Sequence, residues 1–157
     1  MDIEHCEGWL SEPVDPDVAD SAASTHHRQA TLLLVIALGG ALGAAARYAA
    51  GLPWPTPAVA FPWTTLVINV VGCALMGVLM VLVNERFWAP TLLRPFLGTG
   101  VLGGFTTFST YAVDGDQLVR LDAATTAALS LVLTLVLAVL AVWAGATATR
   151  SLTRGPA

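Results

Sequence analysis

The chain has 157 residues, of which 55% are hydrophobic and only 11% charged, with a mean hydropathy of +0.71. Ordinary soluble domains carry roughly 25% charged residues, so this composition excludes that class and indicates a membrane protein. Seven of the eleven acidic residues lie in the first twenty positions, which makes the net charge of −4 a property of the N-terminal segment. Neither nucleic-acid binding nor an acidic globular surface follows from it.

Residues 1–29 are predicted to be a disordered acidic tail. They contain Pro13, Pro16, several Ser and Ala residues and almost no apolar periodicity. Such a segment cannot bury enough surface to offset the entropy lost on ordering.

A transmembrane domain is predicted over residues 30–150, followed by a short C-terminal tail at 151–157. It contains four hydrophobic segments, each near or above the roughly 20 residues that a helix needs to cross ~30 Å of hydrocarbon. Their expected ranges are 31–51, 62–84, 91–112 and 120–149. The first two are separated by a proline- and tryptophan-rich turn at 52–57, and short connections make neighbouring helices antiparallel.

Two polar residues in the first two segments are candidates for function, because polar groups are costly in hydrocarbon. Arg47 follows a helix face with Gly39 and Gly43 spaced for close packing. It is either a fixed cation beside a permeation path or an anchor that reaches the headgroups. Asn69 is the amide in the interior of the second segment, and it serves either as a pore donor or as a hydrogen-bonding group between helices.

The third segment is predicted to be a helix broken in the middle of the membrane. Residues 98–104 hold four glycines, and four of the five residues at 106–110 carry hydroxyls. Broken backbone at this depth is tolerated only where protein buries it or where it lines a polar cavity. The alternative is that the glycines serve only close packing.

An aromatic series and a hydroxyl series follow the predicted break. Phe105, Phe108 and Tyr111 recur every three residues, which places them roughly on one helical face beside Ser109 and Thr110. Ring edges carry positive quadrupole density and could receive a small anion. In the fourth segment, a stripe of hydroxyls at a spacing of four predicts a wet path: Thr126, Ser130 and Thr134.

Apart from Asp122 at the start of the fourth segment, the four segments contain no Asp, Glu or His, so a general base, a proton relay or a zinc site has no evident members. This disfavours an enzyme. An uncharged, donor-rich lining instead favours a passive anion conductor. A single layer of four helices cannot enclose a pore, so a dimer is expected. Two alternatives remain, a small multidrug-type exporter and a non-transporting membrane assembly subunit.

Three motifs give the sequence its resemblance to the Fluc fluoride-channel family, also called CrcB. They lie at residues 40–48, at 69–72 and, most specifically, at 103–111. The resemblance implies a multi-pass inner (plasma) membrane channel that exports fluoride from the cytoplasm, built as an antiparallel dual-topology dimer with two pores. It also implies a structural sodium ion at the dimer centre, held by the backbone carbonyls of Gly103 and Thr106.

The same resemblance assigns the pore residues. Asn69 is the pore amide, Phe108 is the first aromatic of the fluoride site, and Arg47 is the vestibule cation. Ser109 and Thr110 are the neighbouring hydroxyls, while Ser130 and Thr134 resemble a polar track on the last helix. Tyr111 departs from the pattern, because the family usually has a second Phe there.

The partner of the predicted dimer follows from charge. Five arginines fall on the side of the termini and the second connection: Arg28, Arg86, Arg94, Arg150 and Arg154. Arg120, with Arg47 if it is counted, falls on the other side. A chain that inserts both ways needs a bias near zero, so the imbalance favours an oppositely oriented paralogue. Because Arg94 and Arg28 count only weakly, a second copy of the same chain is slightly preferred.

Overall fold

The computed structural model describes residues 16–57, 59–83 and 91–153, with side chains from residue 28 onward, and every regular element in these ranges is helical. The chain divides into two compact units, Met1–Leu34 and Val35–Ala157. Helix α1 (Pro16–Gly51) contributes its N-terminal part to the first unit. All contacts described below lie within the second unit.

Helix α1 begins earlier than the sequence predicts. Residues 16–29 were expected to be disordered and are helical instead, whereas residues 1–15 lie outside the described ranges. Proline is well suited to the first helical position, and Ala19, Ala22 and Ala23 have high helix propensity. The acidic composition therefore gave the wrong prediction for the second half of this segment.

Three helices of the described ranges are long and apolar enough to cross a membrane: Arg28–Gly51, Trp63–Val81 and Ala124–Thr153, with 24, 19 and 30 residues. The last two are α2 and α5. They match the predicted segments 62–84 and 120–149 with shifted ends. The predicted segment 91–112 does not form one long helix.

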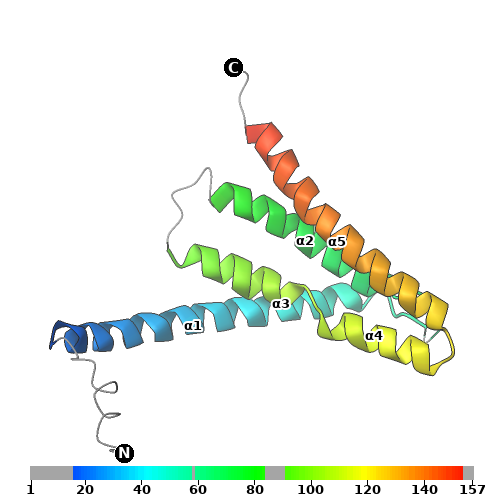
Figure 1. Ribbon diagram of the computed structural model, residues 1–157, viewed down its shortest axis with the longest axis horizontal. Coiled ribbons are helices and arrows are strands. Elements are labelled where there is room, and N and C mark those ends of the chain that lie inside the picture. Colours follow the sequence, from blue (N-terminus) through cyan, green and yellow to red (C-terminus); the bar gives the residue numbers. More distant parts are fainter. Residues whose placement is uncertain (1–15, 58, 84–90, 154–157) are drawn as a thin grey trace, which may run out of the picture. The chain divides into compact units, whose positions relative to one another are not determined.

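The third segment is broken, but not at the glycines. Residues Pro95–Leu102 form the π-helical element η4, Gly103–Phe105 form α3, and Ser109–Arg120 form α4. The non-helical step between α3 and α4 is visible in Figure 1. It begins at Thr106, whose backbone is extended (φ −72°, ψ 158°). The glycines are helical, and the hydroxyl-rich stretch after them is where the helix stops.

Helix α4 continues beyond residue 112, where the sequence predicts an end. The residues between the predicted third and fourth segments are therefore helical, and the turn before α5 consists of Leu121, Asp122 and Ala123. Asp122 has a left-handed backbone (φ 59°), a conformation that Asp tolerates better than most residues.

Glycines bring α1 against η4 and α3. A Cβ built on Gly39 would lie 2.6 Å from the Phe96 carbonyl oxygen, and one on Gly43 would overlap the Val101 carbonyl. From the opposite side, a Cβ on Gly100 would lie 2.9 Å from the Gly39 Cα. The close-packing face predicted for Gly39 and Gly43 is confirmed. Gly100 packs against Gly39, and Gly104 packs against the backbone of the neighbouring Gly40.

Helices α2 and α5 lie side by side (Figure 1). A Cβ on Gly77 would overlap the Val142 carbonyl, and one on Gly145 would overlap the Ala74 carbonyl. Dispersion contacts between closely approaching backbones replace the hydrophobic effect as the force between helices in lipid.

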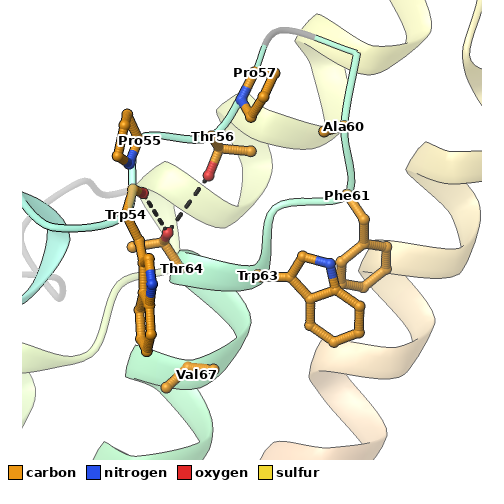
Figure 2. Close-up of a pocket in the computed structure, with 9 residues that line it drawn as sticks. All are labelled: Trp54, Pro55, Thr56, Pro57, Ala60, Phe61, Trp63, Thr64 and Val67. Atoms are coloured by element: carbon orange, nitrogen blue, oxygen red, sulfur yellow. Dashed lines mark hydrogen bonds between the residues drawn. The ribbon is translucent and has the colours of Figure 1, made fainter.

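The proline-rich turn between α1 and α2 is non-helical, as predicted. Figure 2 shows how Thr64 at the start of α2 closes it, donating to the Trp54 carbonyl at 2.8 Å and lying 3.4 Å from the Thr56 hydroxyl. The Phe61 and Trp63 rings pack at 4.6 Å between centroids. Trp54 and Trp63 are mostly exposed, which suits the membrane–water interface.

Candidate functional site

The break in the third segment is held by one side chain of α2. Asn69 is buried, and its Oδ1 accepts the backbone N–H of Thr107 at 2.8 Å while its Nδ2 donates to the Thr107 carbonyl at 3.0 Å. A carboxamide is the side chain that can satisfy both backbone groups of one residue at once. Asn69 thus replaces the helical partners that Thr107 has lost.

The Asn69 carboxamide has a second N–H that can still donate a hydrogen bond. A carboxamide has two N–H groups, and one of them is used on Thr107. In the part of the chain that the structure describes, the second N–H has no hydrogen-bond partner, and Asn69 lines a groove. The structural and the pore interpretations of Asn69 are therefore compatible.

The groove beside Asn69 has a volume of about 320 Å³. It lies among α2, the break, α4 and α5, and is lined by Asn69, Cys73, Thr106, Thr107, Phe108, Tyr111, Thr134, Leu135 and Ala138. Its lining is mainly apolar, with a few amide and hydroxyl groups and no charged side chain. Such a surface can hold a small anion only through fixed dipoles.

Two aromatic rings form one wall of the groove. The Phe108 and Tyr111 centroids lie 5.6 Å apart, with the ring planes inclined at 43°. Phe108 is 79% exposed, so this wall is open on one side in a single chain. The Tyr111 hydroxyl donates to the Leu131 carbonyl of α5 at 3.0 Å, which fixes the orientation of its ring.

Phe105 does not join this aromatic pair. The predicted face of three aromatics assumed one helix through Phe105, Phe108 and Tyr111, but the break falls between the first two. A Cβ on Gly72 would lie 3.1 Å from the Phe105 ring, and Phe105 lines a separate cavity near Trp54. The prediction of a single stripe is wrong for Phe105.

The predicted hydroxyl series on α5 is also divided. Thr134 is buried and lines the groove. Ser130 is equally buried, but its hydroxyl donates to the Ala127 carbonyl of its own helix at 2.8 Å, and it is not part of the groove lining. Thr126 is partly exposed.

Arg47 points into the bundle. Its Nε donates to the Gly104 carbonyl at 3.2 Å, and its Nη1 lies 3.5 Å from the Thr110 hydroxyl oxygen. It lines a second cavity, of about 370 Å³, together with Thr65, Thr107 and Thr110. Of the two interpretations given above, these contacts favour a cation fixed beside the break.

The hydroxyls after the break form a cluster around Thr107. The Thr107 Oγ1 accepts the backbone N–H of Thr110 at 3.0 Å, donates to the Thr110 hydroxyl at 3.0 Å, and lies 3.3 Å from the exposed Ser109 hydroxyl. Sequence reasoning named Ser109 and Thr110 but not Thr107. The signal was its place in a run of hydroxyls, which does not say which member turns inward.

An acid was also missed beside the site. Thr65 on α2 donates to the Asp114 carboxylate on α4 at 2.6 Å, and Asp114 is partly buried. Because α4 extends past residue 112, Asp114 packs against the bundle rather than lying in an open connection.

Comparisons with known proteins show the family to which the chain is similar. The family described as "CrcB-like protein, Camphor Resistance (CrcB)" matches residues 34–146. The "Fluoride-specific ion channel FluC 1" of Streptomyces coelicolor is 57% identical over 122 residues, covering 78% of this chain and 79% of the relative. A channel named FluC 2 of Thermobifida fusca is 47% identical, covering 77% and 90%, and FluC of Agrobacterium fabrum is 41% identical, covering 76% and 97%.

The family match covers more than half of the chain and includes α2, the break and most of α5. The named relatives align over two thirds or more of both chains. The chain therefore belongs to the CrcB family.

Proposed function

We propose that the protein is a passive fluoride channel of the plasma membrane, which lets fluoride leave the cytoplasm and so lowers its toxicity. The observation that carries this proposal is the groove at the helix break, where an amide N–H, hydroxyls and ring edges converge without a charged lining residue. The relatives named as fluoride-specific ion channels supply the identity of the ion.

Donors of this kind suit a small, strongly hydrated anion. Fluoride gives up water only where other donors replace it, and a fixed donor costs no reorganisation when the ion arrives. Asn69 and Tyr111 are both held by hydrogen bonds to the backbone, so their remaining donor and ring edge are positioned in advance. The absence of a cationic lining residue keeps binding weak enough for the ion to leave.

A flux experiment tests the proposal. The purified protein is placed in liposomes loaded with potassium fluoride or potassium chloride, and efflux is started with a potassium ionophore. We expect fluoride efflux that needs neither ATP nor a proton gradient, and little chloride efflux. Equal flux of the two anions would contradict the fluoride proposal, and no flux of either would favour an assembly subunit.

One observation keeps a proton-coupled exporter as a second candidate. Such a transporter needs an acid within the bundle, and Asp114 with its Thr65 donor is the acid that the described residues place there. Fluoride movement that appears only with an opposing proton gradient, and that Asp114→Asn abolishes, would favour this candidate over the channel.

The channel works as an antiparallel dimer in this proposal. The Phe108 ring on the wall of the groove is 79% exposed in a single chain. This exposure supports the need for a second chain, because an open groove would admit lipid. The second chain is a further copy or an oppositely oriented paralogue, with a copy slightly preferred. Labelling Cys6 from each side of intact cells, in a Cys73→Ser background, separates the two. Labelling from both sides supports the homodimer, and labelling from one side supports the paralogue.

We also propose that a structural sodium ion at the dimer centre binds the backbone carbonyls of Gly103 and Thr106. In a continuous helix the Gly103 carbonyl would accept the N–H of Thr107, but that N–H is bonded to Asn69. A carbonyl released in this way fits a hard cation, which takes oxygen ligands. When bound, the ion would neutralise the negative end of α3. We expect dimer stability to fall when sodium is replaced by N-methylglucamine, and equal melting in both would contradict this part.

A further inference from the structure

Two cavities flank the helix break, and one residue belongs to both. The first is the groove that contains Phe108 and Tyr111, and the second is the cavity that contains Arg47. Of the residues that the structure describes, Thr107 alone lines both. Thr107 therefore lies at the boundary between the two cavities.

The backbone of Thr107 is fixed and its hydroxyl can still turn. Asn69 holds the backbone N–H and C=O, at 2.8 and 3.0 Å. The side-chain oxygen accepts the Thr110 N–H at 3.0 Å through a lone pair. Rotation about the C–O bond moves only the hydroxyl hydrogen, so it disturbs none of these three contacts.

The Thr110 hydroxyl has a hydrogen that can be donated to an anion on the Arg47 side. The Thr110 hydroxyl oxygen accepts from Thr107 at 3.0 Å and from Arg47 at 3.5 Å. A hydroxyl has two lone pairs and one hydrogen. Both lone pairs of Thr110 are thus used, and its hydrogen has no acceptor among the described residues, so it is left for an anion in the Arg47 cavity.

We propose that Thr107 is the transfer point between the two cavities. An ion arriving from the Arg47 side is first met by the Thr110 hydroxyl. The Thr107 O–H then turns from Thr110 and donates to the ion as the ion moves into the groove. There the second Asn69 N–H and the edges of the aromatic rings bind it. This inference rests on the proposed fluoride channel and adds a positioning and selecting role for a residue outside the predicted site.

A purely structural role for Thr107 must be separated from this one. Its oxygen caps the N-terminus of α4 by accepting the Thr110 N–H, and losing a cap of this kind destabilises a helix. Thr107→Val keeps the shape but loses both the cap and the donor, whereas Thr107→Ser keeps both. The pair Thr107→Asn and Thr107→Asp tests whether the ion passes this residue. Both side chains can cap a helix, but Asn offers a donor whereas Asp offers only acceptors and a negative charge that would repel a passing anion.

The experiment measures fluoride efflux from liposomes per correctly sized dimer, with thermal melting of each variant as a check on folding. Relative to the natural chain we expect Thr107→Ser to stay within about threefold and Thr107→Val to fall by about tenfold or more, as the loss of one donor to an ion predicts. Thr107→Asn should conduct about tenfold better than Thr107→Asp.

Several results would overturn the inference. Thr107→Val and Thr107→Ser could conduct equally, or Asn and Asp could conduct equally, in which case the hydroxyl acts only as a cap or a spacer. If Thr107→Val does not fold, the Asn and Asp pair decides alone. A natural chain without fluoride flux would instead overturn the proposed function, so the two failures are distinguishable.

Discussion

The Asn69 carboxamide binds both the N–H and the C=O of Thr107, two residues separated by 38 positions in the chain. This pairing makes α2 the support of the break in the third segment. Asn69 is therefore required for the shape of the site, in addition to any contact it makes with the ion.

We expect Asn69→Asp to lose both stability and conduction. The carboxylate would face the Thr107 carbonyl oxygen without a hydrogen to donate, which costs about 1–3 kcal/mol in a buried position. It would also place like charge in the path of an anion. Thermal melting and fluoride efflux check the two effects separately. A variant that melts at the same temperature as the natural chain would contradict the role of Asn69 in supporting the break.

We expect Phe108→Ile to reduce fluoride flux by about two- to tenfold, because the substitute keeps an apolar side chain but loses the ring quadrupole. The stability of a single chain should hardly change, since Phe108 is largely exposed. Efflux at matched dimer content gives the measurement, and unchanged flux would move the ion away from this ring.

Tyr111→Phe should retain or raise fluoride flux, because the ring edge remains and gains freedom to turn toward the groove. It removes the hydrogen bond to Leu131 and should lower stability by about 0.5–1.5 kcal/mol. A variant that melts normally but no longer conducts would instead assign the ion to the phenol hydroxyl.

Glycine substitutions in α1 give a matched pair. Gly43→Ala should prevent normal packing, because its Cβ would overlap the Val101 carbonyl and lie 2.8 Å from the Phe105 nitrogen. At Gly40, three residues earlier on the same helix, a Cβ meets nothing within 4 Å. Gly40→Ala should be neutral or stabilise the helix by up to ~1 kcal/mol. The yield of folded dimer and its melting temperature compare the two, and equal behaviour would contradict the observed packing.

Arg47→Lys and Arg47→Gln separate charge from geometry. Lysine keeps the charge but cannot donate to Gly104 and Thr110 from one planar group, and glutamine loses the charge. If Arg47 attracts the anion, flux should decrease from Arg to Lys to Gln and the effect should weaken at high salt. Equal losses in Lys and Gln at all salt concentrations would assign Arg47 to the support of the break alone.

The sequence alone was enough to predict a helical membrane protein. Its apolar runs match the thickness of the hydrocarbon layer, and they hold few charges because a charge buried in hydrocarbon is costly. It also indicated the interruption of the third segment and the small-residue face at Gly39 and Gly43, since both depend on local residue types. The motif at 103–111 indicated the family, which the comparisons confirm.

The tertiary structure decided what depends on long-range pairing. The break lies at Thr106 rather than at the glycines because Asn69, on another helix, binds Thr107. Phe105 is separated from Phe108 for the same reason, and α4 continues through Asp114 because Thr65 and α5 pack against it. Local propensity cannot report a hydrogen bond between residues so far apart in the chain, so the position of the break and the central place of Thr107 appear only in the folded protein.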